Sequence, residues 1–208
     1  MIDAAIVSWI HDLADSDPRR KSDSATKLYL TGVNLCMPLL SHWVSDPEFR
    51  ELTLPGGVAP SSRAPNSAQA RFPPSTVIVG VAVRPETFWK IRAANNSPRL
   101  AQVPPDQDAR EFELHLDDSL EFDVLTTREP GGQGAIARYL EKFGEGIQQI
   151  EIYLRDVDRA TEILRTRFAL APIYPATRPG ADGTRVNFFL AATPEGKKVL
   201  IELVEAQS

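Results

Sequence analysis

From residue 75 onward, the pattern of apolar and polar positions predicts strands and helices in alternation. The run 77–83 is rich in β-branched residues, as strands are. It is followed by 85–94, a helical segment with a proline at the tolerated first position. Two strands are expected at 111–116 and 120–125, because the polar residues between them are a hairpin signal.

A second round of the same elements follows a glycine-rich stretch at 131–134, which opens a short connecting helix. The alternating run 147–154 predicts a strand, and 156–168 carries apolar residues at helical spacing. The remaining strands are expected at 170–174, 185–191 and 198–204.

The two rounds form an internal repeat of about 60 to 70 residues that rests on element order rather than on identity. This order indicates an α+β fold with paired βαβββ modules, at about 75–129 and 145–206, within a domain that spans 75–208. A helical extension at 1–52 and a linker at 53–74, rich in Pro, Gly and Ser, precede that domain.

The extension is expected to contain two helices. Residues 2–14 place apolar side chains at helical spacing, and a second helix is expected to begin with Ser24 as its N-cap. Pro38 should kink or split that helix, because proline removes an amide donor, and Asp46 should end it. A helical cap, a docking arm or a contact within a homodimer would each explain these helices.

Composition and charge narrow the classes of function. The chain has 208 residues, a net charge of -5 and 42% hydrophobic residues, which suits a globular protein and not a general nucleic-acid binder. Its single cysteine, Cys36, excludes an internal disulfide. No apolar run approaches the ~18 residues of a membrane span, and residues 1–15 do not resemble a signal peptide. A cytoplasmic protein is therefore expected.

Several motifs in the second half resemble one family. The stretch 144–150 resembles the glycine-rich turn and paired-histidine strand of methylmalonyl-CoA epimerases, in the vicinal-oxygen-chelate (glyoxalase/bleomycin-resistance) superfamily. Further resemblances lie at 79–83, 135–142, 156–158, 178–188 and 199–203.

The resemblance implies one divalent metal ion, held by two histidines, an acid or amide, and a glutamate. The glutamate position falls on Glu202, and the acid or amide falls on Asp123, or on Glu121 if the alignment slips by two. The second histidine falls on Gln149 and the first on Ile78, so both imidazoles are absent. The expected metal ligands are thus Asp123, Gln149 and Glu202, and a protein without metal remains the other expectation.

Strand alternation predicts which side chains share the polar face of the sheet. If the sheets curl as in the resembled fold, that face lines a concave pocket. Its members would be Glu113, His115, Glu121, Asp123, Gln149, Glu151, Tyr153, Asn187 and Glu202. A solvated sheet face would give the same alternation of glutamates.

Two functions follow from this face. In the first, an isomerase or lyase moves a proton next to a carbonyl, with a metal ion stabilising the enolate. Its catalytic carboxylates would be Glu202, Glu113 and Glu151. In the second, the face binds a small organic ligand without metal, as a binding protein or a metal-independent enzyme. The residues expected to contact the ligand are Gln149, Tyr153, Asn187 and His115, the last of which could also replace a lost imidazole.

Overall fold

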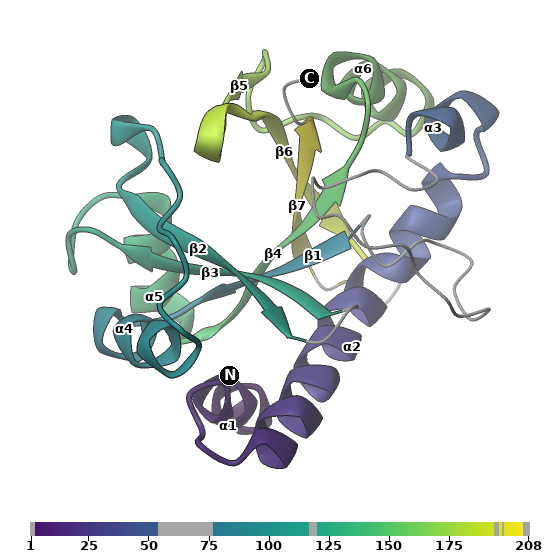
Figure 1. Ribbon diagram of the computed structural model, residues 1–208. Coiled ribbons are helices and arrows are strands. Elements are labelled where there is room, and N and C mark those ends of the chain that lie inside the picture. The colour runs from purple at the N-terminus through teal and green to yellow at the C-terminus, as the bar shows by residue number, and fades with distance from the viewer. Residues whose placement is uncertain (1–2, 54–76, 117–119, 194–195, 197, 206–208) are drawn as a thin grey trace. The chain divides into compact units, whose positions relative to one another are not determined.

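The computed structural model describes residues 3–53, 77–116, 120–193, 196 and 198–205 (Figure 1). The linker expected at 53–74 lies outside the described residues except for Thr53. The chain divides into two compact units. The first contains Met1–Gly32 and Val79–Gln149, and the second contains Val33–Ile78 and Ile150–Ser208.

Unit 1 contains four neighbouring strands in the order β2-β3-β1-β4. They are β1 (Val77–Ala82), β2 (Ala109–Leu116), β3 (Leu120–Thr127) and the first half of β4 (Gly146–Tyr153). Strand β1 pairs with β3 in parallel, whereas β2 and β3 form an antiparallel hairpin. The expected positions of all four strands are confirmed to within two residues at each end.

Helices cover the apolar face of this sheet. Helix α4 (Pro85–Ala94) places Phe88 against Phe112, with ring centroids 4.8 Å apart. Tyr29 meets Phe122 edge to face at 5.9 Å. A 3-10 turn (Pro105–Gln107) and helix α5 (Ala135–Phe143) complete the regular elements between β1 and β4. Buried aromatic rings thus identify this face of the sheet as part of the core.

The first module has two strands after its helix in the described residues, where three were expected. The segment between α4 and β2 makes a backbone hydrogen bond from the Ala101 N–H to the Glu111 carbonyl (3.0 Å), but it forms no strand. Pro98, Pro104 and Pro105 lie in this segment, and proline cannot donate to a strand ladder.

Unit 2 is a complete βαβββ module in the order β4-β7-β6-β5. Strand β4 is followed by helix α6 (Val157–Arg167), the two-residue β5 (Arg178–Pro179), a 3-10 turn (Ala181–Gly183), β6 (Arg185–Ala192) and β7 (Lys198–Glu205). The strand expected at 170–174 is reduced to one bridge between Pro172 and Phe189.

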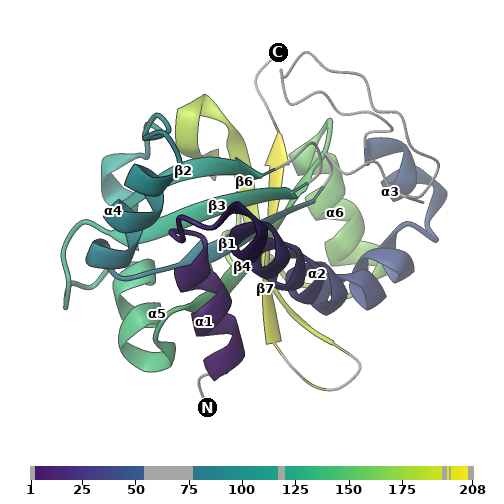
Figure 2. The ribbon, with the colours of Figure 1, turned by 60° about the horizontal axis from the view of Figure 1, so that its bottom comes forward.

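The N-terminal extension contains three helices: α1 (Ala4–Asp12), α2 (Pro18–Trp43) and α3 (Pro47–Leu52). The predicted start was wrong, because α2 begins at Pro18 rather than after Ser24, and Pro38 does not split the helix. The Ser24 hydroxyl instead donates to Asp12 (2.7 Å), which joins α2 to α1 where the two helices lie side by side (Figure 2). Near Pro38, the buried Cys36 and Leu40 hold the helix by packing, which outweighs the loss of one hydrogen bond.

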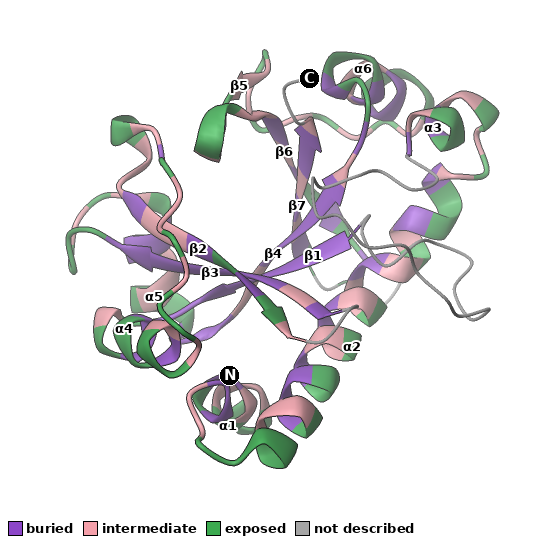
Figure 3. Ribbon diagram, viewed as in Figure 1, coloured by how far each residue is buried: buried purple, intermediate pink, exposed green. Residues whose placement is uncertain are grey.

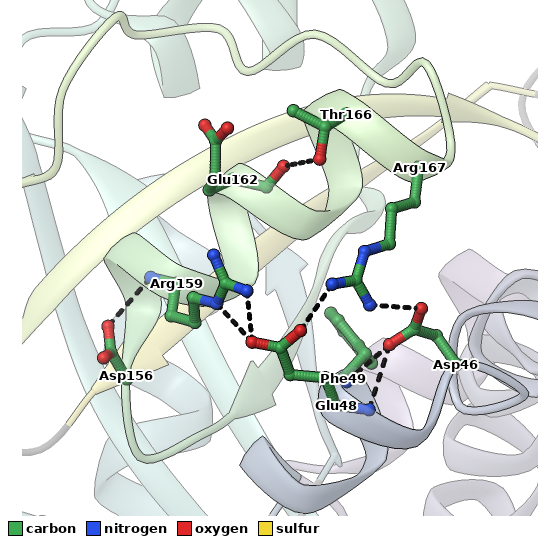
Figure 4. A network of polar contacts seen from close by, with 8 residues as sticks. All are labelled: Asp46, Glu48, Phe49, Asp156, Arg159, Glu162, Thr166 and Arg167. Atoms are coloured by element: carbon green, nitrogen blue, oxygen red, sulfur yellow. Dashed lines mark hydrogen bonds and ion pairs between the residues drawn. The ribbon is translucent and has the colours of Figure 1, made fainter.

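Polar contacts join α3 to α6 within unit 2 (Figure 4). Asp46 caps α3 by accepting from the backbone N–H of Phe49 (3.0 Å), and it also accepts from Arg167 (2.7 Å). Arg159 donates to Glu48 (2.5 Å). This part of the extension is therefore anchored on the second module.

The buried residues follow the strands. Figure 3 shows β1 and β3 buried along most of their length. None of the described helices is long and apolar enough to cross a membrane.

Candidate functional site

A row of polar side chains crosses three adjacent strands of unit 1. Asp123 on β3 is the register partner of Gly80 on β1, and register partners in a sheet present their side chains on the same face. Gln149 on β4 lies on the other side of Gly80. Asp123 and Gln149 are only 6% and 5% exposed. Because burying a carboxylate is costly, this pair is the strongest candidate site in unit 1.

Gly80 makes room for Gln149. A Cβ atom added at Gly80 would overlap Cγ of Gln149 and would lie 3.3 Å from its Cδ. The Gln149 side chain therefore lies across β1, in the space that a side chain at position 80 would fill. The sequence analysis missed this role, although a glycine inside a strand is a recognised sign of such close approach.

The β2–β3 hairpin carries an ion-pair cluster beside this row. Glu113 faces Asp123 and His115 faces Glu121, which confirms that these four side chains share a face. The ring nitrogens of His115 lie 3.2 Å from a Glu113 oxygen and 3.6 Å from a Glu121 oxygen. Hydrogen bonds to Glu113 and then to Glu121 raise the pKa of His115 to about 10.

This pairing bears on the roles expected for His115 and Glu113. A protonated imidazole donates from both nitrogens and has no lone pair for a metal ion. A metal ion would have to displace this proton and the contacts with the two carboxylates, so the ligand role expected for His115 stays a prediction. Glu113 is exposed and pairs with His115, and the catalytic role expected for it stays a prediction.

On β4, strand alternation puts Glu151 and Tyr153 on the same face as Gln149. Glu151 is buried and Tyr153 is half-buried. In unit 2, Glu202 on β7 faces Phe188 on β6 and is half-buried. The catalytic roles expected for Glu151 and Glu202 stay predictions.

The expectation that Asn187 shares a face with Glu202 was wrong. Asn187 faces Leu203, so its side chain lies on the opposite face of the β6–β7 hairpin. There it is fully buried, and its amide donates toward the Thr161 hydroxyl (3.5 Å) and the Tyr174 carbonyl (3.4 Å). These bonds explain why the core accepts a polar residue at this position.

The donor set does not fit the metal ion implied by the resemblance. Among the described residues, no group of three or more His, Cys, Asp and Glu side chains could hold a metal ion. Ile78, at the expected first-histidine position, is a buried apolar residue, and Gln149 offers a neutral amide. Transition metals favour imidazole or thiolate over an amide oxygen.

Comparisons with known proteins agree with this fold. No protein-family model and no curated protein matches the sequence. Among solved structures, methylmalonyl-CoA epimerase from Mycobacterium tuberculosis is similar, with 27% identity, a TM-score of 0.52, and coverage of 64% of this chain and 89% of that chain.

Two further structures resemble the chain at lower identity. A hypothetical protein from Bacillus halodurans has 22% identity and a TM-score of 0.52, covering 64% of this chain and 94% of that one. A Streptomyces coelicolor methylmalonyl-CoA epimerase variant, in complex with 2-nitronate-propionyl-CoA, has 23% identity and a TM-score of 0.50, covering 64% and 98%. These two matches show a common fold.

Proposed function

We propose that this chain, which has the vicinal-oxygen-chelate fold of the methylmalonyl-CoA epimerases, catalyses proton transfer at the carbon next to a carbonyl of a small ligand. The observation that carries the proposal is the buried pair of Asp123 and Gln149 on either side of Gly80. Asp123 takes the proton, and the Gln149 amide donates a hydrogen bond to the carbonyl oxygen as it gains negative charge.

The chemistry of the two side chains supports these roles. A carboxylate that is shielded from water is a stronger base than an exposed one, because burial disfavours its charge. An amide N–H held in place stabilises a developing oxyanion, and such a donor contributes roughly 10²- to 10³-fold in rate. In this arrangement the amide of Gln149 stabilises the negative charge on the carbonyl oxygen, which a metal ion held by imidazoles would otherwise stabilise.

Solvent exchange tests the proposal directly. The protein is incubated with methylmalonyl-CoA in D2O, and deuterium at C2 is followed by mass spectrometry. Asp123→Asn should reduce the exchange rate about 10²- to 10⁴-fold, because the isosteric amide cannot accept the proton. Glu162→Gln, a half-exposed position on α6, is the matched control and should leave the rate unchanged. No exchange by the wild-type protein on methylmalonyl-CoA or other acyl-CoA thioesters would overturn the proposal.

A ligand-binding protein without catalysis is the second candidate. It is favoured by Ile78 and Gln149, which stand where the resemblance implies two histidines. A binder would be stabilised by its ligand by about 2.7 kcal/mol at 100 times the Kd, with no deuterium exchange. Stabilisation by methylmalonyl-CoA together with exchange would instead support the enzyme.

A further inference from the structure

Gly80 is an unusual residue for its place in the chain. It lies inside β1, where all six residues are buried. Glycine weakens a strand interior, because it loses more conformational freedom on folding and has no side chain to pack. A glycine at the centre of a buried strand therefore needs a compensating reason.

The reason is visible on the neighbouring strand. A Cβ at Gly80 would overlap Cγ of Gln149 and lie 3.3 Å from both Cδ and the backbone oxygen of Gln149. The side chain of Gln149 thus leans from β4 over β1. Asp123 on β3 is the register partner of Gly80 on the other side of β1, so Gln149 leans into the row that contains Asp123.

We propose that Gly80 is a positioning residue that determines where the amide of Gln149 lies relative to Asp123. The effect of Gly80 on catalysis rests on the proposed function, whereas its effect on the position of the amide does not. Any side chain at position 80 would displace the amide, and alanine is the smallest change that does so. The backbone oxygen of Gln149, 3.3 Å from the added Cβ, leaves the new methyl group little room to move aside, so the Gln149 side chain has to shift.

Four variants separate this role from simple destabilisation: Gly80→Ala, Gln149→Ala, the double variant, and Val81→Ala. Val81 is fully buried and points to the opposite face of β1, so its truncation destabilises the same strand without touching Gln149. The readouts are the Tm, the deuterium exchange on methylmalonyl-CoA, and the NMR signal of the Gln149 side-chain amide. This signal is assigned as the one that is absent from the spectrum of Gln149→Ala.

Gly80→Ala should lower the Tm by about 2–12 °C through overpacking. In the double variant the overlap is gone, so its Tm should return close to that of Gln149→Ala. The amide signal of Gln149 should shift in Gly80→Ala and stay in place in Val81→Ala. Exchange should fall about 100-fold in Gly80→Ala, because a misplacement near 1 Å has that effect, and should persist in Val81→Ala.

The outcomes distinguish the two proposals. If the wild-type protein exchanges no deuterium, the proposed function fails, and the Tm values and the amide signal still decide the role of Gly80. Additive Tm effects with an unmoved amide signal would overturn the positioning role. So would full exchange activity in Gly80→Ala when the wild-type protein is active.

Discussion

Glu145 is a buried carboxylate at the start of α4 that also contacts α1, and replacing it should destabilise the protein strongly. Its side chain is only 6% exposed, and its two oxygens serve different elements. One accepts from the backbone N–H of Arg84 (2.9 Å) at the start of α4, and the other lies 2.5 Å from the ring nitrogen of His11 on α1. The hydroxyl of Thr87 also bonds to the carboxylate.

The magnitude follows from these contacts. The bonds from the Arg84 N–H and the Thr87 hydroxyl are made to a charged group, and such a hydrogen bond contributes about 1.5–3 kcal/mol. The pair with His11 adds little, since the His11 side chain is 55% exposed and such pairs contribute ~0–1 kcal/mol. We expect Glu145→Ala to lower the free energy of unfolding by about 2–4 kcal/mol, and the Tm by about 4–16 °C.

Urea unfolding of Glu145→Ala measures this loss in the free energy of unfolding, and His11→Ala is the control. The control should lose less than about 1 kcal/mol. Equal losses in the two variants, or a loss below about 1 kcal/mol in Glu145→Ala, would refute the assignment of the main contribution to the bonds with Arg84 and Thr87.

The same carboxylate predicts a pH dependence. Burial alone would raise the pKa of Glu145, but the hydrogen bonds from Thr87, Arg84 and His11 outweigh it and lower the pKa below 4.5. A lowered pKa in the folded state means that the stabilisation is complete above pH 4.5 and is lost as the pH falls below it. Glu145→Gln should therefore flatten the acid limb of the stability profile.

Three further predictions concern other parts of the molecule. Because the pKa of His115 is raised to about 10, its imidazole should show no titration midpoint between pH 6 and 8 by NMR. Its contribution to stability should decline only as the pH rises from 6.5 toward 10. A midpoint near 6.5 would contradict the paired arrangement. Burial raises the pKa of Cys36 to about 12. The thiol of the native protein should therefore react with Ellman's reagent at least ~100-fold more slowly than the thiol of the urea-unfolded chain. Equal rates would show that the native thiol is accessible. Asp46→Ala should lower the Tm more than Glu48→Ala, because Asp46 adds the cap of α3 to its ion pair, whereas Glu48 makes only surface ion pairs, with Arg159 and Arg167. The reverse order in thermal unfolding would contradict this reasoning.

Local pattern predicted much of the fold. The limits of α4 were predicted to the residue, and the elements of the second module were correctly ordered, since their apolar spacing agrees with their packing. The prediction failed where packing overrides local preference. Pro38 continues a helix that is buried on one side, and the prolines between α4 and β2 prevent the expected third strand of the first module.

The candidate site was predicted in part. Alternation correctly placed Glu113, His115, Glu121 and Asp123 on one face of the hairpin. It failed for Asn187, although the fully buried Phe189 two residues later lies on the same face and marks that face as core. Alternation assigns a face to each residue of a strand, but it cannot say which face of one strand joins which face of the next.

The extension also lay beyond the reach of local pattern. The contacts of α1 with Glu145 and of α3 with α6 join residues more than 100 positions apart. The cytoplasmic location and the homodimer stay predictions, as do the domain boundaries.

Deuterium exchange on methylmalonyl-CoA, measured before and after exhaustive treatment of the protein with a strong chelator, tests the account most directly. If Asp123 and Gln149 perform the proton transfer, the exchange rate should be the same in both samples. Exchange that disappears with the chelator and returns with a divalent metal ion would contradict the role given to the Gln149 amide.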